Sequence, residues 1–188
     1  MKPKTIAITG CIGSGKSTVA KILVEEYSFD VIDCDQLARE VANDSAVLAQ
    51  ISLLLGTECV TDGKLNRRKV REIVFSDAEL HKKYSAVFFE RVKSLLMQRV
   101  KGLAIAFVEI PVLDAFLWDW QEIWFVESPR ESCVKRVVLR DGVSEGNVFD
   151  ILARQQSFEN FTRKIVNDGT LDDLRAQVNV ALLDAKLL

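Results

Sequence analysis

The stretch from Gly10 to Thr18 constrains the fold of this chain more than any other part of it. It reads G-C-I-G-S-G-K-S-T and fits the pattern G-x-x-x-x-G-K-[ST]. Glycines let a backbone turn tightly and point several N–H groups inward as an anion nest. Because an apolar run ends at Thr9 and a helical pattern begins at Lys16, the pattern predicts a strand, a phosphate-binding loop and a helix in succession. The alternative is a turn rich in Gly and Ser that binds nothing.

The phosphate-binding loop is expected to take ATP together with Mg²⁺. Lys16 supplies a mobile positive charge that can reach the β- and γ-phosphates, and Ser17 offers a hydroxyl ligand for Mg²⁺. The helix that follows points the positive end of its dipole at the same anion. The predicted nucleotide-binding residues of the loop are Gly10, Cys11, Ile12, Gly13, Ser14, Gly15, Lys16, Ser17 and Thr18.

Composition excludes several functional classes. The chain has 188 residues, 48% of them hydrophobic, which suits one domain with a sizeable core and room for a small inserted subdomain. A net charge of −2 gives no general attraction to nucleic acids or anionic membranes. The four cysteines include no C-x-x-C pair and are interpreted as reduced thiols of a cytoplasmic protein. No apolar run approaches the ~18 residues that a membrane-spanning helix needs. His81, the single histidine, is expected on an exposed helix surface.

Strand patterns alternate with helical patterns along the chain, which indicates a parallel α/β sheet. The expected strands are Lys4–Thr9, Val31–Asp33, Leu103–Val108, Glu122–Val126 and Ile165–Val166. The expected helices are Lys16–Tyr27, Gln36–Asn43, Ala46–Leu55, Arg67–Phe75, a long helix from a capping box at Ser76–Glu79 to Lys101, a helix opened by Ser128–Glu131 and broken at Asp141-Gly142, and a helix capped by Thr170 that runs to Leu187. A turn is expected at Thr61–Gly63.

Three carboxylates stand at the ends of predicted strands. Ligands bind beyond the carboxyl ends of the strands in an open parallel sheet. Asp33 is therefore a candidate base that takes the proton of an acceptor hydroxyl during phosphoryl transfer. Asp35 shares that role or caps the helix that begins at Gln36. Glu109 is a candidate acid on the metal side, with a solvated acid at the strand end as the alternative.

Arg136 and Arg140 lie four residues apart, so they share one face of the predicted helix. They can fold over the ATP phosphates, or form a solvated basic face. A local basic cluster can receive substrate phosphates or be the wet side of a helix; its members are Lys64, Arg67, Arg68, Lys69 and Arg71. Three aromatic residues, Phe116, Trp118 and Trp120, are expected to pack in the core or at its edge.

Three blocks of the sequence, in order, resemble the dephospho-CoA kinase family. The family's opening T-G-G-I-G-S-G-K-S-T is similar to residues 9–18. Its V-I-D-A-D-x-(I/L)-A-R-E block is similar to Val31–Glu40, and its D-G-x-L-N-R-x-x-L-x-x-x-V-F block to Asp62–Phe75. The first block is shared by many kinases, whereas the other two are much narrower. Positions that match the family's lid and its later Q and N are Lys135, Arg136, Arg140, Asp141, Gln155 and Asn167.

The resemblance implies an α/β P-loop kinase fold, with a five-stranded parallel sheet flanked by helices, a helical substrate-binding subdomain and a lid. It also implies that ATP phosphorylates the ribose 3′-hydroxyl of dephospho-CoA to give coenzyme A and ADP, the last step of coenzyme A synthesis. The implied organisation is a single domain, 1–188, in which 1–35 with 103–128 and 160–188 form the nucleotide-binding core, 36–102 the CoA-binding subdomain and 129–159 the lid. A monomer that binds neither nucleic acid nor membrane is expected.

Roles follow from the resemblance position by position. Asp33 would be the acceptor-side base, Lys16 would hold ATP, and Arg140 would act from the lid. Arg136 and Asn167 would contact the nucleotide. The implied substrate-binding residues are Asp35, Arg39, Asn66, Arg67 and Glu109, and the implied metal ligand is Ser17.

The chain departs from the family pattern at several positions. Cys11 replaces a glycine, and the family's His-Pro pair is missing where this chain reads Val87–Glu90. The segment D-x-P-L-L-x-E reads Glu109–Ala115 here, so Asp becomes Glu and the closing Glu is lost or shifted to Asp114. Two other readings stay open: another small-metabolite kinase, similar to shikimate kinase but without its Gly-Gly-Gly segment, and a regulator that binds ATP without turnover.

Overall fold

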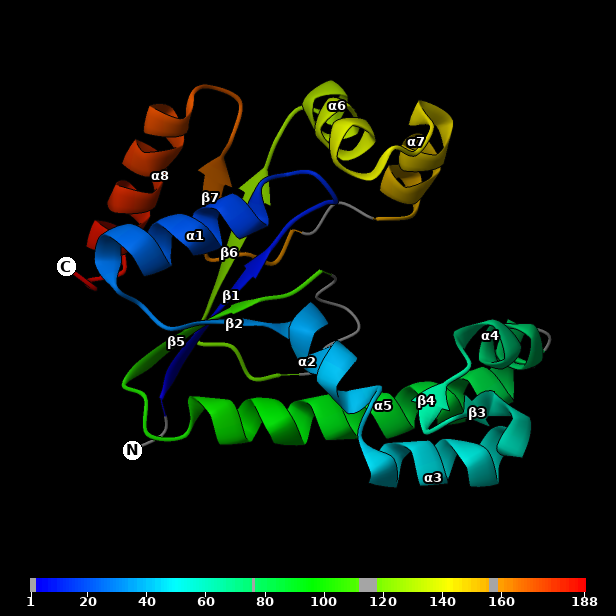
Figure 1. Ribbon diagram of the computed structural model, residues 1–188. Coiled ribbons are helices and arrows are strands. Elements are labelled where there is room, and N and C mark those ends of the chain that lie inside the picture. Colours follow the sequence, from blue (N-terminus) through cyan, green and yellow to red (C-terminus); the bar gives the residue numbers. More distant parts are fainter. Residues whose placement is uncertain (1–2, 76, 112–117, 156–158) are drawn as a thin grey trace. The chain divides into compact units, whose positions relative to one another are not determined.

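The strand that leads into the phosphate-binding loop lies at the centre of a parallel sheet in the computed structural model of the chain (Figure 1). The structure describes residues 3–75, 77–111, 118–155 and 159–188. Within these residues the sheet has five strands, in the order β2 (Val31–Asp33), β5 (Ile105–Glu109), β1 (Lys4–Thr9), β6 (Glu122–Glu127) and β7 (Arg163–Val166). All four pairings are parallel. The α/β fold class predicted from the alternation of patterns is therefore confirmed.

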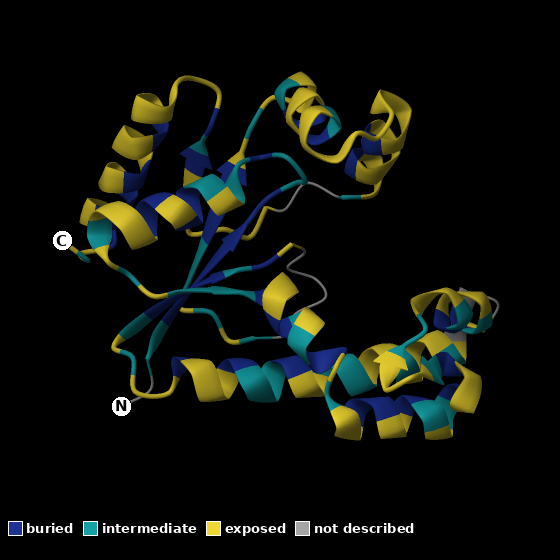
Figure 2. Cartoon of the chain, viewed as in Figure 1, coloured by how far each residue is buried: buried dark blue, intermediate teal, exposed yellow. Residues whose placement is uncertain are grey.

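The chain divides into two compact units, residues 34–101 and the remainder, which are described separately. In the unit that holds the sheet, α1 (Lys16–Tyr27) packs with α8 (Leu171–Asp184) over the core. The strands of the sheet are largely buried, as Figure 2 shows. The largest fully buried side chains of this core include Ile6, Leu23, Phe107, Trp124 and Leu182. Because β1 is buried along nearly its whole length, its near-continuous apolar run is typical of a central parallel strand.

A second, smaller cluster lies between α6 (Arg130–Asp141) and α7 (Glu145–Arg154). Its buried members are Cys133, Val134, Val137, Val148 and Leu152, and Cys11 and Ile12 of the phosphate-binding loop pack against it. This pair of helices therefore forms one wall around the loop.

The unit of residues 34–101 is helical. It contains α2 (Cys34–Val41), α3 (Ser45–Leu55), the short 3₁₀ helix η1 (Thr57–Cys59), α4 (Arg67–Phe75) and α5 (Ala78–Val100). The long helix α5 contacts α2, α3 and α4. The strands β3 (Val60–Thr61) and β4 (Lys64–Leu65) form a hairpin whose turn residues, Asp62 and Gly63, both have positive φ, as a type I′ turn requires.

Several predicted elements have the same bounds in the structure: Lys4–Thr9, Lys16–Tyr27, Val31–Asp33 and Arg67–Phe75. The turn predicted at 61–63 is confirmed, and it connects the two strands of a hairpin. Other expectations are corrected. The caps of α5 and α6 differ from the prediction, because Asp77 caps α5 by accepting from Leu80 N, and Pro129 occupies the cap position of α6.

Further expectations can be compared with the structure residue by residue. His81 is exposed on α5, and the four cysteines, all among the described residues, form no disulfide. Trp118 and Trp120 are half-buried with ring centroids 5.8 Å apart. Ser76, Asp114, Ala115 and Phe116 lie outside the described residues. Across the described part of the chain, no helix combines the length and the apolar content needed to cross a membrane.

Candidate active site

The phosphate-binding loop depends on backbone conformations that glycine adopts without strain. Gly13 has φ 76° and Gly15 has φ 104°. A Cβ added at Gly13 would lie 2.5 Å from the carbonyl oxygen of Cys133, and one added at Gly15 would collide with the side-chain amide of Asn167. The loop therefore lies directly against α6 and against the end of β7.

Three polar side chains hold the loop from outside. Asn167 Nδ2 donates to the carbonyl oxygen of Ser14 at 2.7 Å, and Arg136 Nη1 donates to that of Gly13 at 3.1 Å. Ser128 links the two, since its hydroxyl donates to the carbonyl of Asn167 at 2.5 Å and accepts from Arg136 Nη1 at 2.9 Å. In a trans peptide the carbonyl and the next N–H point in opposite directions. The outward Ser14 carbonyl therefore turns the N–H of Gly15 toward the interior of the loop.

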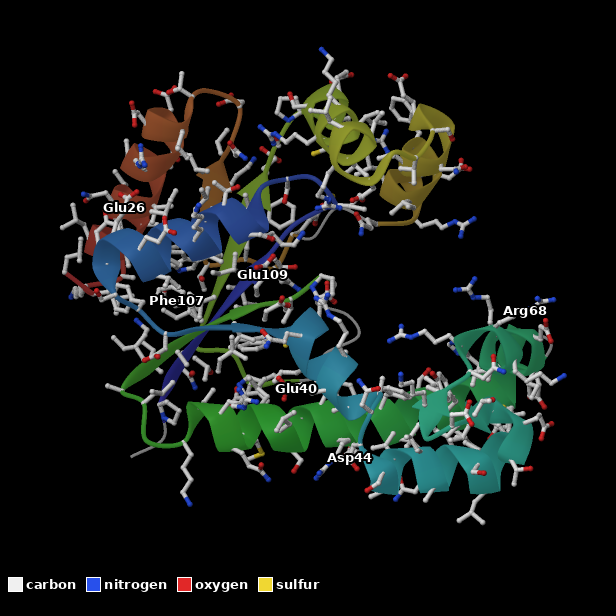
Figure 3. The ribbon with its side chains drawn as sticks, viewed as in Figure 1. Glu26, Glu40, Asp44, Arg68, Phe107 and Glu109 are labelled. Carbon is white, nitrogen blue, oxygen red and sulfur yellow. The ribbon has the colours of Figure 1, made fainter. Side chains whose placement is uncertain are left out.

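Lys16 and Ser17 begin α1 and belong to two different networks. The Lys16 ammonium donates to the carbonyl oxygens of Gly10 at 2.8 Å and Cys11 at 3.0 Å, so its charge lies over the loop itself. The Ser17 hydroxyl donates to Glu109 Oε1 at 2.6 Å. Glu109 ends β5, as Figure 3 shows, and Asp33 is its register partner on β2. The two strand-end carboxylates are thus adjacent at one edge of the sheet, on the side where the loop begins.

The loop fits a bound phosphate chain. Ser14 is 1% exposed, and its hydroxyl oxygen has no hydrogen-bond partner in the part of the chain that the structure describes. Cys133 and Asn167 lie so close to Gly13 and Gly15 that neither position has room for a side chain. Buried polar groups are costly without a partner, so an anion in the loop would satisfy a donor that the protein leaves unused.

Few groups are placed to hold a cation here. Among the described residues, no cluster of three or more His, Cys, Asp or Glu side chains could bind a metal. Mg²⁺ commonly keeps several waters and takes one or two protein ligands together with nucleotide phosphates. The Ser17 hydroxyl fits this pattern: its one proton is donated to Glu109, and the lone pairs of the same oxygen remain for a cation.

The two arginines of α6 have different partners. Arg136 contacts the loop carbonyls, whereas Arg140 forms two hydrogen bonds of 2.7 Å with Asp141, the next residue. The hydrogen bond from Arg140 holds the pKa of Asp141 below its usual value. Burial raises the pKa of the Cys133 thiol, so this side chain stays neutral beside the loop. Sequence spacing alone could not separate the two arginines.

Two residues at the loop were not predicted in their observed roles. Ser128 was expected to cap a helix but connects Arg136 to Asn167. Gln155 was matched only as a family position, and its Oε1 accepts from the N–H of Ile12 at 2.8 Å. For Ser128, the one sequence signal is its place directly after a buried strand, where ligand-binding loops of parallel sheets begin.

The predicted acceptor-binding residues of the helical unit separate into two groups. Asp35, Arg39 and Arg67 line one pocket of about 790 Å³. Asn66 instead accepts from Lys69 N at 3.1 Å and so stabilises the start of α4. Since α2 begins at Cys34, Asp35 lies inside its first turn, and the interpretation of Asp35 as the helix cap is wrong.

The fold and the phosphate-binding loop together define the chain as a P-loop kinase. A crystal structure of a Thermus thermophilus protein matches it with a TM-score of 0.84 and 33% identity over 100% of both chains. A dephospho-CoA kinase from Campylobacter jejuni has a TM-score of 0.63 at 20% identity, covering 97% of both chains. A shikimate kinase from Bacteroides thetaiotaomicron has a TM-score of 0.59 at 14% identity, covering 97% of this chain and 98% of that one. The last two comparisons show likeness of fold.

Sequence comparison gives the family. A family model described as dephospho-CoA kinase matches residues 4–173. A dephospho-CoA kinase from Thermus thermophilus is 37% identical over 97% of this chain and 92% of its own length. Another, from Geobacter sulfurreducens, is 32% identical over 92% of this chain and 94% of its own length. The chain therefore belongs to the dephospho-CoA kinase family, a family of ATP-dependent phosphotransferases.

Proposed function

We propose that the chain transfers the γ-phosphoryl group of ATP to the ribose 3′-hydroxyl of dephospho-CoA, giving coenzyme A and ADP. The observation that carries the proposal is the arrangement at the edge of the sheet. There the loop amides, the Ser17–Glu109 hydrogen bond and the neighbouring carboxylate of Asp33 occupy one side of β1, β5 and β2. Membership of the family supports dephospho-CoA as the acceptor.

Different residues have different roles in an in-line transfer of the γ-phosphoryl group. The inward amides of the loop and the Lys16 ammonium hold the phosphates and stabilise charge that spreads over the transferring group. Asp33 orients the acceptor hydroxyl and takes its proton, while the hydroxyl oxygen bonds to the γ-phosphorus and the bond to the ADP oxygen breaks. Mg²⁺ would be held by Ser17, with Glu109 fixing that hydroxyl, and would neutralise phosphate charge. Arg136 keeps the loop in shape through Gly13.

Other parts of the chain take supporting roles in this proposal. We assign acceptor binding to the helical unit, residues 34–101, and a lid role to 129–159, from which Arg140 would reach the phosphates. Arg140 now donates to the carboxylate of Asp141. If Arg140 donated to a phosphate oxygen instead, its hydrogen bonds would still be to a negatively charged acceptor. Four cysteines without a disulfide suit a reducing compartment such as the cytoplasm.

A panel of acceptors tests the proposal. Purified protein with Mg²⁺ and ATP is given dephospho-CoA, shikimate, gluconate or no acceptor, and ADP release is followed. Mass spectrometry and a 3′-nucleotidase then locate the new phosphate. We expect turnover with dephospho-CoA and a phosphate at the ribose 3′ position. Turnover with shikimate but not dephospho-CoA would overturn the assignment in favour of another metabolite kinase, and ATP binding without turnover on any acceptor would favour a regulator.

A further inference from the structure

The helical unit contains a pocket of about 790 Å³ that is lined by apolar and by cationic side chains. Val70 and Val74 of α4 are buried in it, and Tyr84 and Phe88 of α5 form an aromatic pair with ring centroids 5.1 Å apart. All four side chains line the pocket. A concave apolar surface with a few convergent polar groups is the usual form of a site for a small organic ligand.

Two arginines of α4 supply the charge. Arg67 and Arg71 lie four residues apart on one helix face and both line the pocket. Neither makes a hydrogen bond or an ion pair with any residue that the structure describes. Like charges at this spacing repel each other and destabilise a helix. Arg39 also lines the pocket, and among the described lining residues the one carboxylate is that of Asp35.

The other two cations of the same helix are both paired with one acid. Arg68, labelled in Figure 3, contacts Glu72 at 3.1 Å, and Lys69 Nζ contacts the other Glu72 oxygen at 3.8 Å. Neither lines the pocket. The one acid of α4 therefore pairs with the two cations outside the pocket, and the two arginines that line the pocket have no acidic partner on this helix.

The charge of Arg67 is felt inside the pocket. Burial raises the pKa of Tyr84, and the neighbouring Arg67 acts in the opposite direction. The Tyr84 hydroxyl is therefore a neutral hydrogen-bond donor close to a cation that has no ion-pair partner among the described residues. A ligand with a compact double negative charge would fit these groups better than a neutral one.

We propose that Arg67 and Arg71 bind the diphosphate of the acceptor, while Tyr84 and Phe88 contact the uncharged part attached to it. The proposal rests on the proposed function, which makes dephospho-CoA the acceptor. That molecule carries one diphosphate, linked to the ribose whose 3′-hydroxyl reacts. Asp35, which also lines the pocket, follows Asp33 by two residues in the sequence.

The test compares Arg67→Gln and Arg71→Gln with Arg68→Gln, the adjacent arginine that pairs with Glu72. Steady-state rates are measured with dephospho-CoA and with ATP varied in turn. Each pocket variant should raise KM for dephospho-CoA about 10- to 100-fold, the scale of a lost charge-assisted contact, and leave KM for ATP within about twofold. Arg68→Gln should match the wild type, and Arg71→Lys should recover part of the loss because it keeps the charge.

Ionic strength separates a charge effect from a packing effect. KM of the wild type for dephospho-CoA should rise with added salt, and the Arg67→Gln/Arg71→Gln double variant should lose most of that dependence. If folded pocket variants keep the wild-type KM, or keep its salt dependence, the assignment of the diphosphate is wrong while the kinase activity stands. If the wild-type protein does not turn over dephospho-CoA, the proposed function fails and this inference fails with it.

Discussion

The hydrogen bond between Ser17 and Glu109 offers the sharpest test of the active site. Its O···O distance is 2.6 Å, typical of a hydroxyl that donates to a carboxylate. A hydrogen bond to a charged group is worth about 1.5–3 kcal/mol, which is about 10- to 150-fold in rate if it is needed in the transition state. Glu109→Gln keeps the shape of the side chain and removes the charge. Ser17→Ala removes both the donor and the proposed Mg²⁺ ligand.

Four proteins form the double-mutant cycle: the wild type, Glu109→Gln, Ser17→Ala and the double variant. The assay is kcat/KM for ATP at saturating dephospho-CoA over a titration of Mg²⁺. We expect Glu109→Gln to need more Mg²⁺ for half-maximal rate and to lose about 10- to 150-fold in kcat/KM. Because the carboxylate acts through the hydroxyl, the double variant should be close to Ser17→Ala alone.

Glu127→Gln is the matched control, since Glu127 also ends a strand of the sheet but pairs with Lys164 at the surface. It should leave the Mg²⁺ requirement unchanged. Independent sites usually add within about 0.3–0.5 kcal/mol. Additive losses in the double variant, or a wild-type Mg²⁺ requirement in Glu109→Gln, would refute the coupling between carboxylate and hydroxyl.

Three further outcomes are expected. Lys16→Ala and Asp33→Asn should each lower kcat by more than about 100-fold with dephospho-CoA, because one removes charge stabilisation and the other the base; a wild-type rate in Asp33→Asn would remove that residue from the mechanism. Asp44 caps α3 and accepts two hydrogen bonds from Arg91. Asp44→Ala should therefore lower the Tm by about 3–6 °C, and Asp44→Asn, which keeps a cap, should lower it by clearly less. Equal losses of Tm in a thermal melt would show that the cap contributes little. Burial opposes ionisation of Glu122, but hydrogen bonds from Lys4, Arg163 and Trp124 outweigh it and lower its pKa below the ordinary 4.5. The stability that this carboxylate adds is thus complete above pH 4.5 and is lost as the pH falls through the lowered pKa, so urea midpoints of wild type and Glu122→Gln should converge in acid, and a constant gap would contradict the assignment.

Local patterns predicted the parts of the fold that local physics decides. The loop between β1 and α1 could be predicted because glycine spacing, an apolar strand and a helix start all lie within one short stretch. The rule that ligands bind beyond the carboxyl ends of parallel strands selected Asp33 and Glu109 as candidates, and the register of β2 and β5 shows that the two residues are neighbours. Strand order and the division into two units depend on contacts between distant segments, which no local pattern contains.

The error at the start of α6 has a physical cause, which is competition for the Ser128 side-chain hydrogen bond. Ser128 precedes Pro129 and matches a capping pattern, yet its hydroxyl donates to Asn167, 39 residues away in the sequence. In the same way, Arg136 and Arg140 are equivalent by spacing, but Arg140 has an acid as its next neighbour, and Arg136 has the loop carbonyl of Gly13. A side chain that donates to a buried carbonyl from a distant part of the chain satisfies a group that water cannot reach. A helix end at the surface can be satisfied by water, so the distant partner is favoured over the local cap.

Cys11 shows how the loop tolerates a departure from the family's glycine. Among the described residues other than glycine, positive φ occurs at three positions, and Cys11 is not one of them. The backbone there does not need glycine, in contrast to Gly13 and Gly15. The side chain of Cys11 packs against the α6–α7 cluster that includes Cys133. A side chain at this position therefore adds apolar contact between the loop and the helices, and it does not require the loop backbone to change its conformation.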